Sequence, residues 1–478
     1  MVQGPGQTMG DPAARPSRGI VAAAGYLPYR RLDRATITGV AGGGGGNGWR
    51  TVASYDEDAT TMAVEASRLA LREVPGLVPA TVRFATVAPP YLDRTNATAI
   101  HAALRLPPTS AAYDDLGSVR SAMGALRAAV GEDGASLVVA ADLRSGLAGS
   151  PDESVFGDGA AALVLDDGSR SPVLAALESW ASLTEEFVDR WRVPGDARSR
   201  VWEERFGELR YLPLGGGALA AALDGAGLSA DDVDHLVVAG THGRAVRSVA
   251  AKSGVDPGRV VDDLSSSVGN TGAAHPFLLL ASVLERAAPD EVVVLLVLAD
   301  GAEAVVLRTT AALAARSPGR PVSDQLAAGA PVPYGTYLAW RGVLAVEPPR
   351  RPEPARTSSS AAARSTDFKF GFVGSQDEAG GIHLPPSPLD LLSHPMAEAT
   401  GTVTTFTVDR LSYSPSPPTV FAVVDFEGGG RLPVELTDVD AEKVAIGDRV
   451  EMTFRKLFTA DGIHNYFWKA RPVREGGR

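Results

Sequence analysis

The sequence predicts a layered α/β fold followed by a small all-β domain, and three observations support this prediction. From Gly19 onward, short continuous apolar runs alternate with Ala-rich helical runs. Strands that alternate with helices are typical of layered α/β folds. The pattern occurs twice before residue 345. Beyond a stretch rich in Pro, Arg, Ser and Ala, a series of short strands with approximate apolar alternation follows.

The predicted elements follow from spacing and capping. A helix begins near Asp58, with Asp or Thr as its cap, because Met62, Ala66 and Leu69 recur at helical spacing. Residues 118–130, which are rich in small side chains, predict a second, tightly packed helix. Continuous apolar runs indicate strands that are buried on both faces. Such runs occur at residues 137–141, 160–165, 236–238 and 292–298.

The α/β part divides into two similar halves, residues 18–170 and 171–345. Each half ends in a pair of buried strands, LVVAADLR then GAAALVL in the first and EVVVLLVLADG then AEAVVLR in the second. We therefore predict a two-fold internal repeat. Residues 1–17 are polar and rich in Pro and Gly, so a disordered leader is expected there.

The C-terminal part is predicted to be a separate unit. Residues 346–366 have no apolar period, which is typical of a linker. After it, TGTVTTFTV, TVFAVVDF, RLPVEL and RVEMTFRKL are short strands separated by Pro, Gly and Asp. About five such strands over ~75 residues predict a small barrel of the OB type at residues 401–478.

Composition excludes several classes of protein. The 478 residues include 45 Lys and Arg against 57 Asp and Glu, for a net charge of −12 and no long basic stripe, so no nucleic-acid partner is expected. No run approaches the ~18 apolar residues of a membrane span, and the N-terminus lacks the apolar core of a signal peptide. We expect a cytoplasmic protein. The chain has no cysteine, which excludes disulfides, thiolate zinc sites and a Cys nucleophile.

Five motifs occur in order along the α/β part: GYLP at 25–28, YDEDATTMAVEA at 55–66, FGDGAAA at 156–162, VGNTGAA at 268–274, and YG with YLAWR between 334 and 341. Together they resemble the thiolase superfamily, in particular HMG-CoA synthase-like and ketoacyl-ACP synthase III-like proteins. The match spans about residues 18–345. The resemblance implies a duplicated thiolase-like layered α/β/α/β/α fold followed by a small all-β OB-fold barrel. It also implies a homodimer, or a heterodimer with a thiolase-like paralogue.

The tail resembles the acyl-CoA-associated OB family that often accompanies thiolase-like proteins. FVGS at 372–375 and IHLPP at 382–386 resemble its zinc ribbon, and IGDRV at 446–450 resembles a late barrel strand. The ribbon's four Cys ligands are missing, and His383 is the one histidine within these motifs. We therefore expect a degenerate ribbon at 367–400 without a metal ion.

In the resembled families, a Cys at a buried helix N-terminus is acylated by the CoA thioester with the help of a His and an Asn. HMG-CoA synthases add a Glu. Aligned on the motifs, the Cys position falls on Val119, which excludes the usual acylation. The His position falls on Ala239 or, with one gap, on His242. The Glu position falls near Val87, and the Asn is kept as Asn270.

His242, His275 and Asn270 are the candidate catalytic residues, and each has a structural alternative. His242 follows a buried strand in a Gly-flanked loop, where it could instead bond the backbone. His275 could cap or pack at a helix start, and Asn270 could shape its own turn. Asp158 is predicted to have a structural role, in which it satisfies backbone N–H groups of the GDGA turn.

Four further residues are candidates for substrate binding. Arg120 and Arg244 could meet CoA phosphates, although a single loop Arg is usually solvated. Tyr91 and Tyr113 lie near segments that line the family pocket, where a phenol can act as an acid or simply pack. The run of glycines from Gly42 to Gly46 has no Lys-Ser/Thr pair after it, so it predicts a flexible loop rather than a phosphate loop.

Two functional hypotheses follow. The first is Cys-independent C–C bond cleavage or formation, of the aldol or retro-aldol type, on acyl-CoA or acyl-carrier substrates; it needs a general base and a hole that stabilises an enolate. The second is a non-catalytic protein that binds acyl-CoA or scaffolds a catalytic thiolase-type partner, because apolar residues replace the reactive ones. Coenzyme A enters as part of the substrate, and no covalently bound cofactor is expected.

Overall fold

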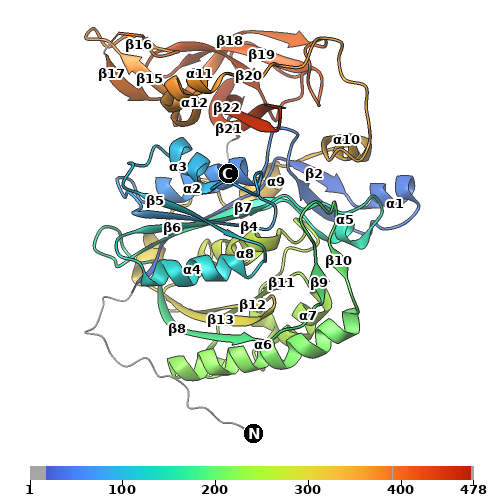
Figure 1. Cartoon of the computed structure of the whole chain (residues 1–478). Coiled ribbons are helices and arrows are strands. Elements are labelled where there is room, and N and C mark those ends of the chain that lie inside the picture. The colour runs from blue at the N-terminus through green and yellow to red at the C-terminus, as the bar shows by residue number, and fades with distance from the viewer. Residues whose placement is uncertain (1–17, 390, 475–478) are drawn as a thin grey trace.

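The structure, a computed structural model, describes residues 18–389 and 391–474; the predicted leader lies outside them. Nine strands form one hydrogen-bonded sheet in the order β11-β12-β13-β8-β1-β7-β6-β4-β5. Its two parts meet where β1 pairs with β8 over two residue pairs. Figure 1 shows these parts as two stacked sheets with helices between and outside them, which confirms the predicted five-layer fold.

Each sheet comes from one half of the chain, apart from the narrow join. The first sheet contains β1 (Gly19–Tyr26), β4 (Thr81–Thr86), β5 (Ala111–Leu116), β6 (Ser136–Asp142) and β7 (Gly159–Asp166). The second contains β8 (Ala175–Thr184), β11 (His235–Gly240), β12 (Val292–Leu298) and β13 (Gly301–Thr309). β6, β7 and β12 are buried along their whole length, as their continuous apolar runs predict.

Each of the three helical layers packs against the sheets through an apolar cluster. The outer layer of the first sheet consists of α2 (Ala59–Arg72) and α3 (Ala97–Ala103), the central layer of α4 (Ser121–Gly131) and α8 (His275–Leu284), and the outer layer of the second sheet of α6 (Glu204–Ala226) and α7 (Gly243–Ala251). The helix at α2 forms as predicted. The Asp58 carboxylate accepts from the Thr61 N–H and the Thr61 hydroxyl accepts from the Asp58 N–H, so the two residues form a capping box.

Shorter elements complete the α/β part. They are β2 (Arg30–Asp33), α1 (Ala35–Ala41), β3 (Trp49–Val52), α5 (Pro151–Val155), β9 (Arg190–Trp191), β10 (Arg200–Val201), α9 (Val322–Ala328), β14 (Ala330–Pro331) and α10 (Tyr334–Trp340). Single turns of 3-10 helix lie at Ala230–Asp232, Pro257–Arg259, Gly272–Ala274 and Ala311–Ala315. Within the described ranges, no helix combines the length and the apolar composition needed to cross a membrane.

The C-terminal domain is a closed barrel of five strands in the order β18-β19-β20-β22-β21, which agrees with the predicted OB fold. The strands are β18 (Thr400–Asp409), β19 (Thr419–Phe426), β20 (Arg431–Leu436), β21 (Arg449–Ala460) and β22 (Ile463–Pro472). Phe454 and Trp468 fill its interior. The Trp468 indole donates to the carbonyl of Phe370, which ties the barrel to the segment before it.

The segment before the barrel is more regular than its composition predicts. The helix α11 (Ser359–Arg364) lies at the end of the expected linker, and the Ser358 hydroxyl caps it. A second short helix, α12 (Thr366–Gly371), begins at the last residue of the linker and extends into the region where a ribbon remnant is expected. Where a ribbon remnant is expected, β15 (Val373–Gln376), β16 (Ile382–His383) and β17 (Leu392–Pro395) form a small sheet. His383 Nε2 lies 2.9 Å from an Asp377 carboxylate oxygen there.

Candidate functional site

The positions predicted for the Cys and the Glu of the resembled families, and Ala239 as one of the two alternatives for the His, lie in or against one apolar cluster. Val119, just before α4, is 8% exposed, and Ala239 on β11 is 1% exposed. Both belong to the cluster between the two sheets, and Val87 packs against it. None of these three side chains can accept or donate a proton, so the geometry provides packing here and no reactive group.

If Val119 is part of the core, truncating it creates a cavity. We expect Val119→Ala to lower the free energy of unfolding by roughly 1–3 kcal/mol in urea titrations, because two buried methyl groups are lost and neighbours relax only partly. The exposed Val343 is the matched control, and Val343→Ala should change stability by less than about 0.5 kcal/mol. Equal stability of the Val119 variant and the wild type would instead indicate that this side chain faces an open pocket.

His242 is the N-cap of α7. Its Nδ1 accepts from the Ala245 N–H at 3.1 Å, and its Nε2 donates to the Glu204 carbonyl at 2.8 Å. A Cβ on Gly207 would lie 2.7 Å from the imidazole, so α6 packs directly against the ring. Both ring nitrogens are therefore engaged with backbone groups, in the neutral tautomer that carries its proton on Nε2.

Asn270 and His275 lie on one turn that leads into α8. The Asn270 amide donates to the Gly240 carbonyl at 2.8 Å, and its oxygen accepts from the Gly272 N–H at 2.9 Å. His275 is 3% exposed, and burial lowers its pKa to about 4, so it is neutral at pH 7. The N–H and the hydroxyl of Thr271 each lie 3.4 Å from its Nδ1. In the described part of the chain, no hydrogen bond joins these side chains to one another or to that of His242.

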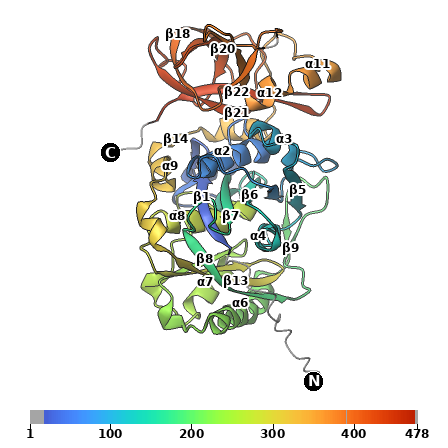
Figure 2. The same cartoon turned by 90° about the vertical axis from the view of Figure 1, so that its left-hand side faces the viewer.

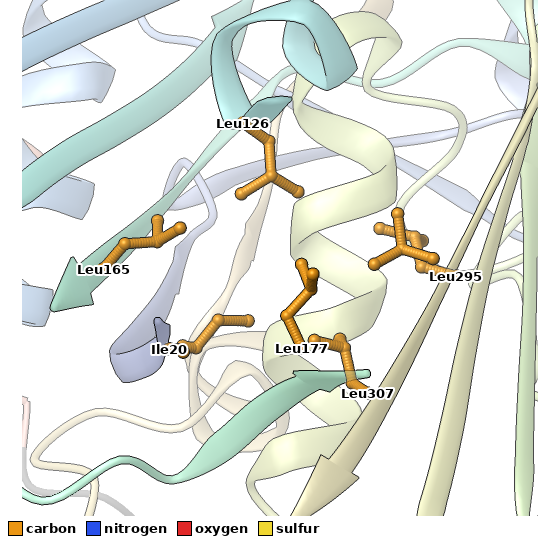
Figure 3. Close-up of a pocket in the computed structure, with 8 residues that line it drawn as sticks. Ile20, Leu126, Leu165, Leu177, Leu295 and Leu307 are labelled. Atoms are coloured by element: carbon orange, nitrogen blue, oxygen red, sulfur yellow. The ribbon is translucent and has the colours of Figure 1, made fainter. Parts of the chain in front are cut away.

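Two cavities lie elsewhere. The first, of about 10 Å³, lies between the two sheets and is lined by apolar side chains that surround it in Figure 3, among them Ile20, Leu126 and Leu295. The second, of about 180 Å³, is lined by residues of α2, of the end of α8 and of the 317–320 loop. None of the candidate catalytic residues lines either cavity.

The candidate substrate-binding residues are distributed over separate regions. Arg120 pairs with Glu303 at 3.1 Å and also binds two hydroxyls of the β8 end, so its guanidinium is already occupied. Arg244 forms an ion pair with Glu208. The Tyr113 side chain is half exposed on β5.

Tyr91 contacts the barrel instead of a pocket. Its hydroxyl accepts from the His464 N–H at 2.7 Å, at the hairpin between β21 and β22. The loop between β4 and α3 is therefore attached to the C-terminal domain.

Two buried aspartates hold the centre of the α/β part together. The Asp158 carboxylate accepts from the backbone N–H groups of Ala53 and Arg144, each at 2.7 Å, and pairs with the Arg341 guanidinium. Its role is structural, as predicted, but these N–H groups lie outside the GDGA turn in which the prediction placed them. Asp142, which the sequence did not single out, accepts from the N–H groups of Val87 and Ala273. It thereby fixes the turn next to Asn270.

A buried network of charges, also missed from the sequence, joins the barrel to α2. Arg455 on β21 is fully buried, and its guanidinium lies 2.6 Å from Glu57, 2.9 Å from Asp438 and 3.6 Å from Asp56. Lys469 on β22, also fully buried, lies 3.0 Å from the Asp56 carboxylate.

The network continues along α2. Arg471 on β22 lies 2.9 Å from Glu65 and 2.8 Å from Glu451, and Arg68 pairs with Glu65 at 2.8 Å. The YDEDATTM motif that carries part of the family resemblance therefore also docks the barrel. Two features of the sequence could have predicted this network: an acidic run before a helix, and single basic residues within apolar barrel strands.

Comparisons with known proteins agree with this architecture. Residues 223–309 match the family described as 3-oxoacyl-[acyl-carrier-protein] synthase III C terminal, and residues 394–455 match the ChsH2 C-terminal OB-fold domain. The hydroxymethylglutaryl-CoA synthase of Aeropyrum pernix is 30% identical over 349 residues, which cover 69% of this chain and 96% of that protein. That of Methanopyrus kandleri is 26% identical over 299 residues, which cover 59% and 85%.

Solved structures show the same fold at lower identity. A structure of HMG-CoA synthase complexed with CoA has a TM-score of 0.57 at 17% identity and covers 67% of this chain and 89% of that one. The 3-oxoacyl-(acyl carrier protein) synthase III of Pseudomonas aeruginosa PAO1 has a TM-score of 0.53 at 22% identity, with coverage of 62% and 98%.

Proposed function

Because the chain belongs to the hydroxymethylglutaryl-CoA synthase family but has no cysteine, we propose that it is a non-catalytic, thiolase-type subunit that binds acyl-CoA or scaffolds a catalytic partner. The family consists of thiolase-like proteins that condense acyl-CoA. The observation that supports the proposal is the apolar cluster that contains Val119, Ala239 and Val87. If the alignment with Ala239 at the His position holds, the nucleophile, the His and the Glu of the family each correspond here to a side chain that packs.

Aldol-type cleavage or formation of a C–C bond is the second candidate. It is favoured by Asn270 and His275, which share one turn, and by the match of the tail to the ChsH2 OB-fold domain. The contacts of His242 and His275 argue against the aldol-type hypothesis. A general base must be within reach of the substrate proton with a free lone pair. His242 has neither nitrogen free, and His275 is buried with a low pKa.

A scaffold needs a surface for its partner, and β5 provides one. It is the last strand of the nine-stranded sheet and pairs with β4 on one side. Tyr113 and Leu116 on this strand are exposed. Unpaired strand edges are templates for pairing with another chain. We propose that a second thiolase-type subunit, identical or paralogous, pairs along this edge.

Turnover of acyl-CoA esters tests the proposal. We expect no conversion when the purified protein is incubated with a panel of β-hydroxyacyl-CoA and acetoacetyl-CoA esters and analysed by mass spectrometry. His242→Ala should instead lower the free energy of unfolding by about 1 kcal/mol, because it removes a helix cap. The surface variant His383→Ala is the control for a nonspecific loss of stability or activity.

A different result of the turnover assay would contradict the proposal. If the wild type cleaves or forms any of these esters, and His242→Ala lowers the rate by about 100-fold or more while His383→Ala does not, the protein is an enzyme and the aldol hypothesis replaces the scaffold.

A further inference from the structure

A cavity of about 180 Å³ lies at the opposite end of α8 from the Asn270 turn. Its walls come from β1, the end of α2, the residue that caps α8 and the 317–320 loop. The ten residues of α8 separate it from His275 by about 15 Å. Figure 2 shows α2 and α9, which follows the loop, directly below the barrel, in agreement with Figure 1. The cavity therefore lies near the junction of the two domains, where ligand sites are common, and apart from the candidate site.

Four charged side chains line this cavity, and three of them already have partners. Arg72, Glu73 and Arg320 form ion pairs with side chains that do not line it, namely those of Glu398, Arg316 and Glu451. The fourth, Glu285, forms no ion pair with any residue in the described ranges. Glu285 is therefore the charge in this cavity that a ligand can still neutralise.

The Glu285 carboxyl group is partly buried. Both of its oxygens accept from the Val322 N–H, at 3.0 and 3.1 Å. Burial raises its pKa to about 7, and the Val322 N–H and the positive charge of Arg316 offset this effect only in part. A carboxylate that is withdrawn from water without a counter-ion is costly to the fold. A cation that enters the cavity beside Glu285 would therefore be stabilised.

The other walls are largely apolar and leave room for a small organic molecule. They include Ala23, Ala24, Leu69 and Pro318. A cavity of about 150 Å³ can hold benzene, so this one accommodates about six non-hydrogen atoms. Within the described ranges, no group of three or more His, Asp or Glu side chains is placed to hold a metal ion. The lining therefore favours a cation with a short apolar chain over a bare metal ion.

We propose that this cavity binds a small organic ammonium ion, with its charge on the Glu285 carboxylate and its hydrocarbon chain against Ala24 and Leu69. An ammonium group carries three N–H donors and supplies the counter-charge that Glu285 lacks. Ser317 and Gly319 are exposed, so the loop that contains them lies at the rim where the ligand enters. This site goes beyond the proposed binding of acyl-CoA and does not depend on it.

Isothermal titration calorimetry of the full chain with n-butylammonium chloride at pH 8 tests the proposal. Butylammonium has few enough non-hydrogen atoms to fit the cavity, and we expect a Kd of about 1 mM or lower. 1-Butanol and butyrate also have four carbon atoms, but they carry no charge and a negative charge. Both should bind at least about tenfold more weakly, because neither provides a cation for the carboxylate.

A variant without the charge locates the ligand. Glu285→Gln keeps an oxygen that accepts from the Val322 N–H but removes the negative charge, so the Kd of butylammonium should rise at least about tenfold. Glu378→Gln is the matched control, because Glu378 is exposed between β15 and β16, outside the cavity lining. This control variant should bind butylammonium like the wild type.

The same titration at pH 6 provides a second measurement. Butylammonium, like a lysine side chain, stays protonated at both pH values. With a pKa of about 7, Glu285 is mostly ionised at pH 8 and about one-tenth ionised at pH 6. The apparent Kd should therefore rise about tenfold in the wild type and stay unchanged in Glu285→Gln. The other charged groups around Glu285 include no histidine; they are Arg72, Glu73, Arg316, Arg320 and Asp324.

Four results would overturn the proposal. Equal binding of 1-butanol would assign the affinity to apolar contacts, and tighter binding of butyrate would assign it to the arginines. An unchanged Kd in Glu285→Gln would place the ligand elsewhere, and no binding of any probe would leave the cavity to water. If Glu285→Gln does not fold, the comparison of the three probes on the wild type still decides. None of these results bears on the turnover of acyl-CoA esters, so the two proposals fail or survive separately.

Discussion

Replacing Arg455 by methionine is expected to lower the free energy of unfolding by about 3–5 kcal/mol. Removing one partner from a buried ionic cluster leaves the remaining charges without compensation, at a cost of this size. Arg455 faces three carboxylates, those of Asp56, Glu57 and Asp438, and is fully buried. Methionine keeps the apolar length of the side chain, so the loss of stability measures the effect of removing the positive charge. Urea unfolding followed by circular dichroism measures it.

Arg449 is the control on the same strand. Its guanidinium lies 2.6 Å from Glu427, and both side chains are more than half exposed. Exposed ion pairs contribute at most about 1 kcal/mol, so Arg449→Met should be nearly neutral. The double variant Arg455→Met with Glu57→Gln should recover part of the lost stability, because it removes one of the orphaned carboxylates. Equal effects of Arg455→Met and Arg449→Met would mean that the network does not hold the barrel to α2.

Local patterns in the sequence predicted the layers because each layer is built from local periodicity. The capping residue Asp58 and the apolar spacing after it specify α2, and continuous apolar runs specify strands such as β12, which is buried on both faces. The helix α11 was not anticipated, because Ser- and Ala-rich segments have helical propensity without an apolar period. Its cap, Ser358, was the available signal.

The candidate site was less predictable because its contacts are non-local. Alignment to family motifs located Val119 and Ala239, and the structure shows both inside one apolar cluster. One partner of His242, the Glu204 carbonyl, comes from α6, which lies about 40 positions earlier in the chain, and no spacing rule connects the two. The charge network is the extreme case, because Asp56 and Arg455 meet across nearly the whole sequence. Whether His242, His275 and Asn270 act in catalysis stays a prediction for the turnover assay.

Acid should release the barrel from α2. Burial alone would raise the pKa of Glu65, but the positive charges of Arg68 and Arg471 lower it by more, so that its pKa lies well below the ordinary value of a glutamate. The same balance of burial against neighbouring cations lowers the pKa of Asp56 and of Glu451. A carboxyl whose pKa is depressed in the folded state stabilises the fold above its unfolded pKa and loses that contribution as the pH falls.

The magnitude follows for Glu65, whose unfolded pKa is 4.5. Between pH 7 and pH 3 its contribution should fall by about 2 kcal/mol, since at pH 3 the unfolded chain binds the proton and the folded chain does not. Glu65→Gln has no carboxyl group at this position and therefore lacks this pH-dependent contribution. The stability difference between wild type and Glu65→Gln should therefore shrink by about 2 kcal/mol over that range in urea titrations. For the exposed Glu427, the corresponding difference with Glu427→Gln should stay within about 0.5 kcal/mol. A pH-independent difference for Glu65 would show that folding does not lower the pKa of this carboxyl, and the two arginines would then contribute little to the docking of the barrel.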